Sequence, residues 1–353
     1  MIHKRKIVIA GLLLASIALP STVYAATAKK VPTVAAGAVV VGASPAPPSG
    51  PGPGTLTVWQ PGDATVHQVP FAPAGTMTGS SFYVAADQAT HSIFVPTEAG
   101  VTKVVSTRSW RVEGSFTSPA GSRVAKVTAN GRLVLVESAS QTVGYQTTSP
   151  YRAVFTASVG GNALVIAPNG KDAFVGGNAD TVVTELALPS GKVVRSFAVH
   201  RSGDMAWAAG QIFSADIASG VMTIIRPDSG QIIRIATPEV DPTFNYSSIA
   251  MATSGFMQLA VSPGQHRVYA AGFSGHILVF STRLDTYLGE VKITANPGTA
   301  NQLSGLAVLP GGRQAVVTVE NLSRTLVVSL RTGKVVSSQI DLPSNRWVLV
   351  SGS

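Results

Sequence analysis

A unit of about 39 residues recurs along this sequence and limits what the chain can fold into. Leu135, Phe174 and Phe213 occupy the same place in three consecutive copies, at steps of 39 residues. Later copies, at 268–270 and 315–317, keep the pattern but contain insertions. Each copy has four short apolar or alternating runs separated by turns rich in Gly, Pro, Asn, Asp or Ser. This period predicts repeated four-stranded units that bury their apolar faces against one another.

Hairpins between the third and fourth runs provide a second count of the units. Six belong to complete units, whereas the first of the seven, at 55–71, lacks the two strands that should precede it. The last apolar run, 346–350, is similar to the second-strand run 132–136 and is followed by no partner. We expect it to complete the first unit as a second strand, because pairing of the two chain ends closes a ring and hides both sheet edges. The predicted hairpins are 55–59 with 65–71, 101–107 with 110–116, 142–147 with 151–156, 181–188 with 192–198, 221–226 with 231–236, 276–281 with 288–294, and 325–330 with 334–340.

The sequence therefore predicts an all-β fold, a seven-bladed β-propeller over residues 55–353 that is closed by pairing of N- and C-terminal strands in one blade. The unit also resembles the YVTN-type repeat of bacterial and archaeal surface and periplasmic propellers. The matching segments are 163–170, 186–194, 259–264 and 267–272, although no copy contains the family tetrad in full. The resemblance implies the fold and leaves the activity open, because the family includes binding proteins, surface proteins and relatives of lactonases and quinoprotein dehydrogenases.

The first 25 residues have the pattern of a secretory signal. A basic segment, 4–6, precedes the apolar run 7–19, and small side chains occupy the positions before a cleavage point after Ala25. We expect an exported protein, periplasmic or at the cell surface, with no membrane span after cleavage; retention of the segment as an anchor is the alternative. Residues 26–54, rich first in Ala and Val and then in Pro and Gly, are interpreted as a linker.

The amino-acid composition limits the reactions and partners that are available to this protein. The chain has no cysteine, which excludes thiol nucleophiles, iron–sulfur clusters and cysteine-ligated zinc. Its formal net charge is +9, and removal of the three basic residues of the signal leaves +6, spread along the chain. This excess indicates ordinary solubility or, less strongly, a polyanion or nucleic-acid partner. No cofactor is predicted. Asp63, Asp228 and Asp285 recur near turns, where they are interpreted as turn residues, with a calcium site as the alternative. For the cofactor, the alternative to none is a divalent cation over the central channel.

The long insertion 237–255 is the first candidate ligand-binding segment. It joins the outer strand of one unit to the inner strand of the next, which places it on the face where propellers usually bind ligands. Its candidate residues combine carboxylates with aromatic groups, a combination suited to a sugar, peptide or cation; the alternative is a segment that only caps the channel. They are Glu239, Asp241, Phe244, Asn245 and Tyr246.

An equivalent junction one unit earlier supplies further candidates. His200, Arg201 and Trp207, with Asp204 between them, are expected near the same opening. Arginine and tryptophan at a channel mouth suit an anionic ligand. The alternative for Trp207 is packing between two units.

Two classes of function follow. The first is a non-catalytic binding or scaffold protein that recognises a protein or a cell-envelope component through the loops of one face. The second is a propeller enzyme of lactonase or quinoprotein type with a site over the channel. The enzyme hypothesis needs acidic residues at the opening, where Glu137 and Glu320 are candidates and Glu185, within a third strand, is a weaker one.

Overall fold

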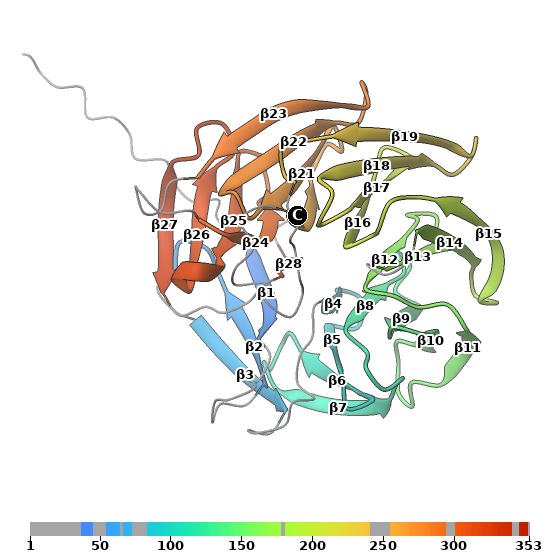
Figure 1. Ribbon diagram of the computed structural model, residues 1–353. Helices are drawn as coiled ribbons and strands as arrows, with labels where there is room; N and C mark the ends of the chain where they lie inside the picture. The colour runs from blue at the N-terminus through green and yellow to red at the C-terminus, as the bar shows by residue number, and fades with distance from the viewer. Residues whose placement is uncertain are drawn as a thin grey trace, which may run out of the picture. The chain divides into compact units, whose positions relative to one another are not determined.

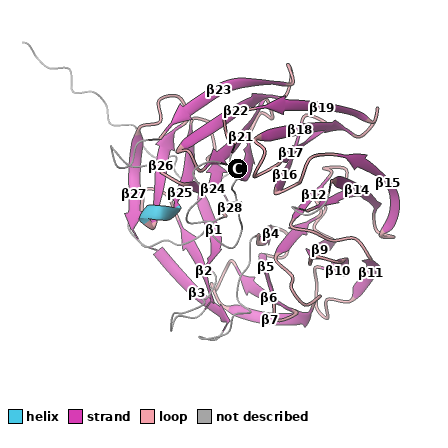
Figure 2. Cartoon of the chain, in the orientation of Figure 1, coloured by secondary structure: helices cyan, strands magenta, loops and turns pink. Residues whose placement is uncertain are grey.

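The computed structural model describes residues 37–44, 54–63, 66–72, 83–177, 181–240, 255–293, 301–340 and 346–351. The predicted signal, 1–25, lies outside these ranges. The chain divides into two compact units, 1–32 and 33–353, and all that follows concerns the second. Its strands form seven four-stranded antiparallel sheets arranged in a ring (Figure 1), which confirms the predicted seven-bladed propeller. Within the described residues, the regular structure is strand except for one 3-10 turn, η2 (Glu320–Leu322), as Figure 2 shows.

Within blades 2 to 7 the chain runs outward from the centre of the ring, strand by strand. Blade 2 contains β4 (Ala85–Asp87), β5 (Ser92–Thr97), β6 (Val101–Ser106) and β7 (Val112–Thr117). Blade 3 contains β8 (Val124–Val127), β9 (Leu133–Glu137), β10 (Thr142–Gln146) and β11 (Ala153–Ala157). Blade 4 contains β12 (Ala163–Ile166), β13 (Asp172–Gly176), β14 (Val182–Ala187) and β15 (Lys192–Ala198).

The second half of the ring repeats this order. Blade 5 contains β16 (Asp204–Ala208), β17 (Gln211–Ala215), β18 (Val221–Arg226) and β19 (Gln231–Ala236). Blade 6 contains β20 (Phe256–Val261), β21 (Arg267–Gly272), β22 (His276–Ser281) and β23 (Thr286–Lys292). Blade 7 contains β24 (Leu303–Val308), β25 (Gln314–Val319), β26 (Arg324–Ser329) and β27 (Val335–Ile340). All the predicted hairpins are confirmed, with strand ends within a few residues of the expected positions.

Blade 1 closes the ring with strands from both ends of the chain. Its order is β28 (Val348–Ser351), β1 (Val39–Ser44), β2 (Gly54–Trp59) and β3 (Val66–Ala72). The C-terminal strand is therefore the innermost strand of the blade. The sequence had led us to expect it in the second position. The second strand is β1, which pairs with β28 on one side and β2 on the other.

The expected linker over 26–54 is consequently wrong for Val39–Ser44. The run of three valines, 39–41, is typical of a buried strand, because β-branched side chains pack well on a pleated sheet. The Pro- and Gly-rich composition of the following residues obscured this signal. Residues 26–36 and 45–53 of the expected linker lie outside the described ranges.

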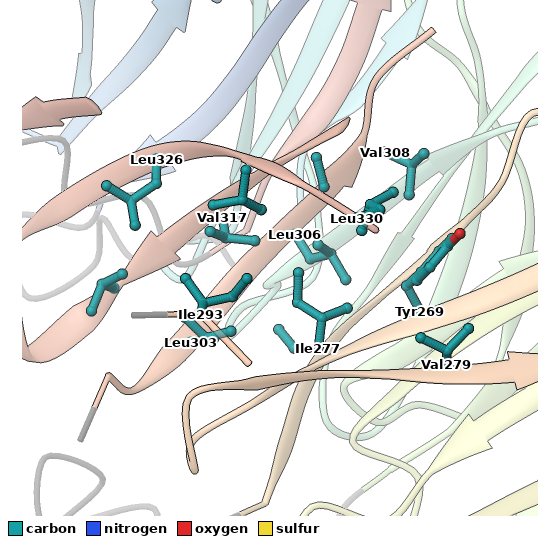
Figure 3. Close-up of a cluster of buried hydrophobic side chains, with 14 residues drawn as sticks. Tyr269, Ile277, Val279, Ile293, Leu303, Leu306, Val308, Val317, Leu326 and Leu330 are labelled. Atoms are coloured by element: carbon teal, nitrogen blue, oxygen red, sulfur yellow. The ribbon is translucent and has the colours of Figure 1, made fainter. Parts of the chain in front are cut away.

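Each neighbouring pair of blades shares a large cluster of buried hydrophobic side chains, which gives seven such clusters among the described residues. A small eighth cluster of Ile217, Met257 and Phe273 joins blades 5 and 6. Strand β21 shows how a blade serves two of them. Val268 and Ala270 face the cluster with blade 5, whereas Tyr269 and Ala271 face the cluster with blade 7, because successive side chains of a strand point to opposite faces. Figure 3 shows the latter cluster, in which side chains from both blades meet in one layer. Both faces of a blade are buried, so its second and third strands are nearly continuous apolar runs.

Trp347 completes the cluster between blades 7 and 1. Its indole is fully buried, lies 6.4 Å from the ring of Trp59, and donates from Nε1 to Thr318 Oγ1 at 2.6 Å. Gly305 leaves the room that this ring occupies, since a Cβ at that position would lie 2.7 Å from Trp347 Cδ1. The last residues of the chain are thus locked into the seam where the ring closes.

Replacing this indole tests the closure. We expect Trp347→Ala to lower the free energy of unfolding by about 3–5 kcal/mol, because a large buried aromatic side chain is lost together with its hydrogen bond. The matched control is Leu288→Ala on outer strand β23, where the side chain is 48% exposed and the expected change is within ~0.5 kcal/mol. Urea titration gives the free energy of unfolding of both variants. Unfolding is followed by far-UV circular dichroism, because this signal does not depend on the tryptophan that is removed. Equal small effects would contradict the assigned role of the seam.

Candidate functional site

Two polar side chains of the inner strands tie successive blades together at the centre of the ring. Asp204 of β16 accepts the backbone N–H of Leu259 in the next blade at 2.7 Å. Gln258 of β20 repeats this contact, since its Oε1 accepts the N–H of Leu306 in blade 7 at 2.8 Å and that of Trp347 at 2.9 Å. The Gln258 amide also donates to the Trp347 carbonyl at 2.8 Å. Four neighbouring blades are therefore joined by side chains that replace water as the partner of buried amides.

Tyr83 connects this arrangement to the opposite side of the ring. It lies just before β4 in blade 2, and its hydroxyl donates to Oδ2 of Asp204 in blade 5. Two cations flank its ring, with Lys126 Nζ at 4.1 Å and the Arg346 guanidinium at 5.4 Å from the centroid. Cations over an aromatic face are stabilised by its negative potential, more so when water is excluded. Tyr83, Lys126, Asp204 and Arg346 are called the central cluster below.

Burial governs the ionisation of the central cluster. It raises the pKa of Asp204, against the opposing effect of Arg346 and Lys126 and of the hydrogen bonds from Leu259 and Tyr83. It likewise raises the pKa of Tyr83 well above its usual range, and the Asp204 charge adds to this shift. The pKa of Lys126 is lowered by burial and by Arg346, while Asp204 and Glu137 act in the opposite sense. Such opposed effects within one site are typical of functional positions and of structural ion networks alike.

Glu137 is the unsatisfied member of this region. It ends β9, its side chain is fully buried, and neither carboxyl oxygen has a hydrogen-bond partner in the described structure. Burial raises its pKa well above the usual value, with a smaller opposing effect from Lys126. The other two acids considered from the sequence differ from each other. Burial raises the pKa of Glu320, against the opposing effects of Ser304 and Arg346, and its Oε2 is likewise buried without a hydrogen-bond partner in the described structure. Glu185 of β14 instead forms an ion pair with Arg195 at 2.6 Å.

A cavity of about 220 Å³ lies at the centre of the ring beside the central cluster. Lys126 and Tyr83 contribute to its lining together with Gln258, and aliphatic side chains of the inner strands form most of the remaining wall. Polar and apolar atoms share the wall of this cavity about equally. The other lining residues are Met205, Leu259, Ala260, Val261, Leu306, Ala307, Val308, Trp347, Val348 and Leu349.

Glu239, a residue predicted from the sequence, holds the base of the long insertion. Its side chain is 1% exposed, and its Oε2 accepts the backbone N–H of Gly255 at 2.9 Å. Its Oε1 accepts the hydroxyl of Ser274, which lies in the turn between β21 and β22. Gly272 permits this approach, because a Cβ there would lie 2.4 Å from Glu239 Oε1. One carboxylate thus binds both ends of the insertion and the adjacent turn.

Further polar groups extend from this carboxylate across blade 6. Ser274 Oγ lies 2.7 Å from His276 Nδ1, and His276 Nε2 lies 3.4 Å from Glu290 Oε1. The Tyr287 hydroxyl donates to Glu290 Oε2 at 3.3 Å, and burial with the nearby carboxylates raises its pKa to about 12. Within the described residues, no group of three or more His, Cys, Asp or Glu side chains is arranged to hold a metal ion.

The other residues predicted from the sequence, apart from Trp207, lie outside the described ranges or at the surface. Asp241, Phe244, Asn245 and Tyr246 lie outside the described residues. His200 is 45% exposed, with Nδ1 3.8 Å from Asp216 Oδ2, and Arg201 is exposed beside it.

Trp207 lies apart from His200 and Arg201. It sits near the opposite end of β16 from Asp204 and packs 5.9 Å from Phe174 of the preceding blade. Trp207 is three positions from Asp204 in β16, so the two side chains point to opposite faces of the strand. Its packing between two blades matches the alternative interpretation.

Sequence reasoning missed Tyr83, Lys126, Gln258 and Arg346. A signal was present in two of them, because Lys126 and Gln258 each interrupt an otherwise apolar inner run. Tyr83 and Arg346 precede their strands, and only the folded ring brings them together. Asp204 was expected near the opening together with His200 and Trp207. Its contacts to blades 2 and 6 could not be predicted, because no pattern in the sequence near Asp204 indicates them.

Comparison with known proteins defines the fold and nothing finer. No family model and no curated protein sequence matches this chain. Its structure is similar to that of a chain of Kuenenia stuttgartiensis hydrazine synthase, with a TM-score of 0.60, 12% sequence identity, and coverage of 77% of this chain and 80% of that one. At this identity the likeness shows the propeller architecture alone. Membership of the YVTN-type repeat family stays a prediction. As for membrane spans, the described part of the chain contains no helix of sufficient length and apolarity to cross a bilayer.

The ionisation of Glu137 predicts a specific pH dependence of stability. Burial raises its pKa in the folded protein well above the ordinary value of a glutamate carboxyl, so the folded state retains a proton that the unfolded state releases. Glu137 therefore does not lower the free energy of unfolding below pH ~4.5, where it is protonated in both states, and it lowers that free energy increasingly as the pH rises toward its pKa in the folded protein. We expect Glu137→Gln to be more stable than the wild type above that pH, by an amount that grows with pH. Melting temperatures from pH 4 to 9 measure the difference; parallel curves would contradict the assignment.

Proposed function

We propose that this protein is an exported binding protein, in which the propeller is a rigid platform and the loops that enter the inner strands recognise a partner. The partner class that we favour is a protein or a component of the cell envelope. Export rests on the N-terminal signal pattern, and the choice of face rests on the insertion that follows β19.

The observation that carries this proposal is the position of Glu239. This carboxylate accepts a hydrogen bond from Gly255 and one from Ser274, so the insertion starts and ends at one fixed point of blade 6. The 14 residues between Val240 and Gly255 include Asp241, Phe244, Asn245 and Tyr246. A long segment with aromatic and acidic side chains on a fixed base is a suitable recognition element, because a rigid base reduces the entropy lost on binding.

The centre of the ring supports the same interpretation. Asp204 and Gln258 use their oxygen atoms to bind amides of neighbouring blades. These side chains stiffen the platform on which the loops are mounted. A platform whose inner strands are joined in this way holds the loops of adjacent blades at constant spacing, and constant spacing is what a composite binding surface requires.

A site-specific cross-linking experiment tests the proposed face. A photoreactive phenylalanine analogue is placed at Phe244 or Tyr246 in the insertion, and at Val193 on outer strand β15, which is 47% exposed, as the matched control. We expect a discrete cross-linked species, formed in cells, from the insertion positions and not from Val193. Cross-linking from Val193 alone, or equally from all three positions, would contradict recognition through this face.

Two further variants make the result specific. Glu239→Ala removes the hydrogen bonds to Gly255 and Ser274, and we expect it to lower the yield of the cross-linked species several-fold. Glu113→Gln, in an exposed carboxylate on outer strand β7 of blade 2, should leave the yield unchanged. Circular dichroism confirms that both variants are folded.

Thermal-shift measurements distinguish the proposed binding protein from an enzyme and from a polyanion-binding protein. A rise in melting temperature with a divalent cation that a chelator reverses would favour an enzyme of lactonase type, and a rise with a quinone cofactor would favour the quinoprotein type, because a ligand of the folded state stabilises it by mass action. A rise with single-stranded DNA that disappears at high salt would favour a polyanion partner.

A further inference from the structure

We propose that the central cavity binds a short organic acid as its carboxylate anion, held by the ammonium group of Lys126. This activity is independent of the partner recognition described above, since it uses the centre of the ring and not its loops. The ligand is defined by its chemistry: one carboxylate, a small alkyl or aryl group, and no further charge.

The wall of the cavity presents a single charge, and that charge is positive. Among the described residues that line it, only Lys126 of β8 is a charged side chain, and no carboxylate is among them. The volume of about 220 Å³ compares with roughly 30 Å³ for one molecule of liquid water, so a small organic molecule fits. Polar and apolar atoms share the wall about equally, which suits a ligand with a charged head and a short apolar body.

The ammonium group of Lys126 has donors that no described side chain or backbone group accepts. Nζ lies 4.1 Å from the centroid of the Tyr83 ring, and in the described part of the chain it makes no hydrogen bond and no ion pair. The aromatic face favours the charged form, but an ammonium group carries three N–H donors, and burying them costs free energy unless they are hydrogen-bonded. Since Lys126 lines the cavity, its occupant is the group that supplies the acceptors.

The nearby carboxylate of Asp204 is committed to other donors. It accepts hydrogen bonds from the Tyr83 hydroxyl and the Leu259 amide and none from Lys126. The guanidinium of Arg346 lies 5.4 Å from the centroid of the same Tyr83 ring, so two cations lie beside this one carboxylate. A second anion in the cavity therefore meets a positive potential, and it neutralises charge where a water molecule satisfies only the donors.

Glu137 does not take the place of this anion. It is not among the residues that line the cavity, it forms no ion pair with Lys126, and both its oxygens are buried away from any described donor. A carboxyl group enclosed in this way is costly as an anion, in agreement with its raised pKa. The charge that faces the cavity is thus the one on Lys126.

A carboxylate ligand also affects the protonation of Lys126. Burial lowers the pKa of this lysine and Arg346 acts in the same sense, while Asp204 and Glu137 favour the ammonium form. A bound carboxylate acts in the same sense as these two acids, so binding raises the pKa of Lys126. Affinity for the ligand accordingly falls as the pH rises through the pKa of Lys126 in the free protein.

Calorimetric titration of the full chain at pH 7 with butyrate and benzoate, each compared with its own amide, tests this proposal. Acid and amide have nearly the same size and shape, and only the acid is charged. We expect each acid to bind at one site per chain, about tenfold or more tighter than its amide, because hydrogen bonds to charged groups are the stronger ones. Absence of binding by both acids, or equal affinities for acid and amide, would overturn the proposal. Equally tight binding of inorganic phosphate would overturn the choice of an organic acid.

Variants assign the binding to Lys126. Lys126→Met removes the charge from a side chain of similar length and should abolish the preference for the acid, whereas Lys126→Arg keeps a cation and should retain it. Lys192→Met, at an exposed lysine of outer strand β15, is the matched control and should bind as the wild type does. A preference that survives in Lys126→Met would remove Lys126 from the site.

Nuclear magnetic resonance of the lysine side chains gives a readout on the wild-type protein. We expect butyrate to raise the pKa of one lysine, whose signal is missing from Lys126→Arg. Lysine titration curves that butyrate leaves unchanged would contradict contact between the carboxylate and this ammonium group.

Discussion

The structure depends on the burial of both faces of every blade. Side chains along a strand alternate between the two faces, and here both sets are apolar, so that β21 alone contributes to the cluster with blade 5 and to the cluster with blade 7. A sheet of this kind needs a neighbour on each side, and an open row of such sheets would leave two apolar faces exposed to water. Closure of the ring removes that cost, since burial contributes roughly 25 cal/mol per Å² of apolar surface. The absence of cysteine means that no disulfide shares this task.

The repeat made most of this architecture predictable. Turn residues and apolar alternation are local properties, so the third and fourth strands of each blade, such as β18 and β19, were located almost to the residue. The closing blade was predicted only in part, because its strands come from opposite ends of the chain and their order is decided by pairing. Valines 39–41 carried the missing signal, and the Pro- and Gly-rich residues that follow them led to the expectation of a linker.

The candidate site was much less predictable than the fold. Glu239 was identified because an insertion within a regular repeat is visible in the sequence, although its partners Ser274 and Gly255 were not. The central cluster was not recognised as a site, since Tyr83, Lys126 and Arg346 belong to different blades and meet only when the ring closes. Trp207 illustrates the opposite case, in which proximity in sequence to Asp204 suggested a shared opening, but the residues lie at opposite ends of one strand.

The centre and the seam of the ring are linked by the same few contacts. Gln258 binds the backbone of Trp347, the indole of Trp347 fills the space beside Gly305, and Arg346 lies over the ring of Tyr83. The last residues of the chain therefore close blade 1 and also complete the polar interior around the cavity. Loss of these residues is expected to loosen distant blades as well as the blade to which they belong.

Hydrogen–deuterium exchange of a chain truncated before Arg346 tests this account most directly, with a chain lacking only the last two residues as its control. If closure holds the whole ring, the truncated chain should lose amide protection around all seven blades, including inner strands β12 and β16 far from the deletion. Loss of protection confined to β1, β2 and β3 would show that the blades are stable without closure, and would contradict the account.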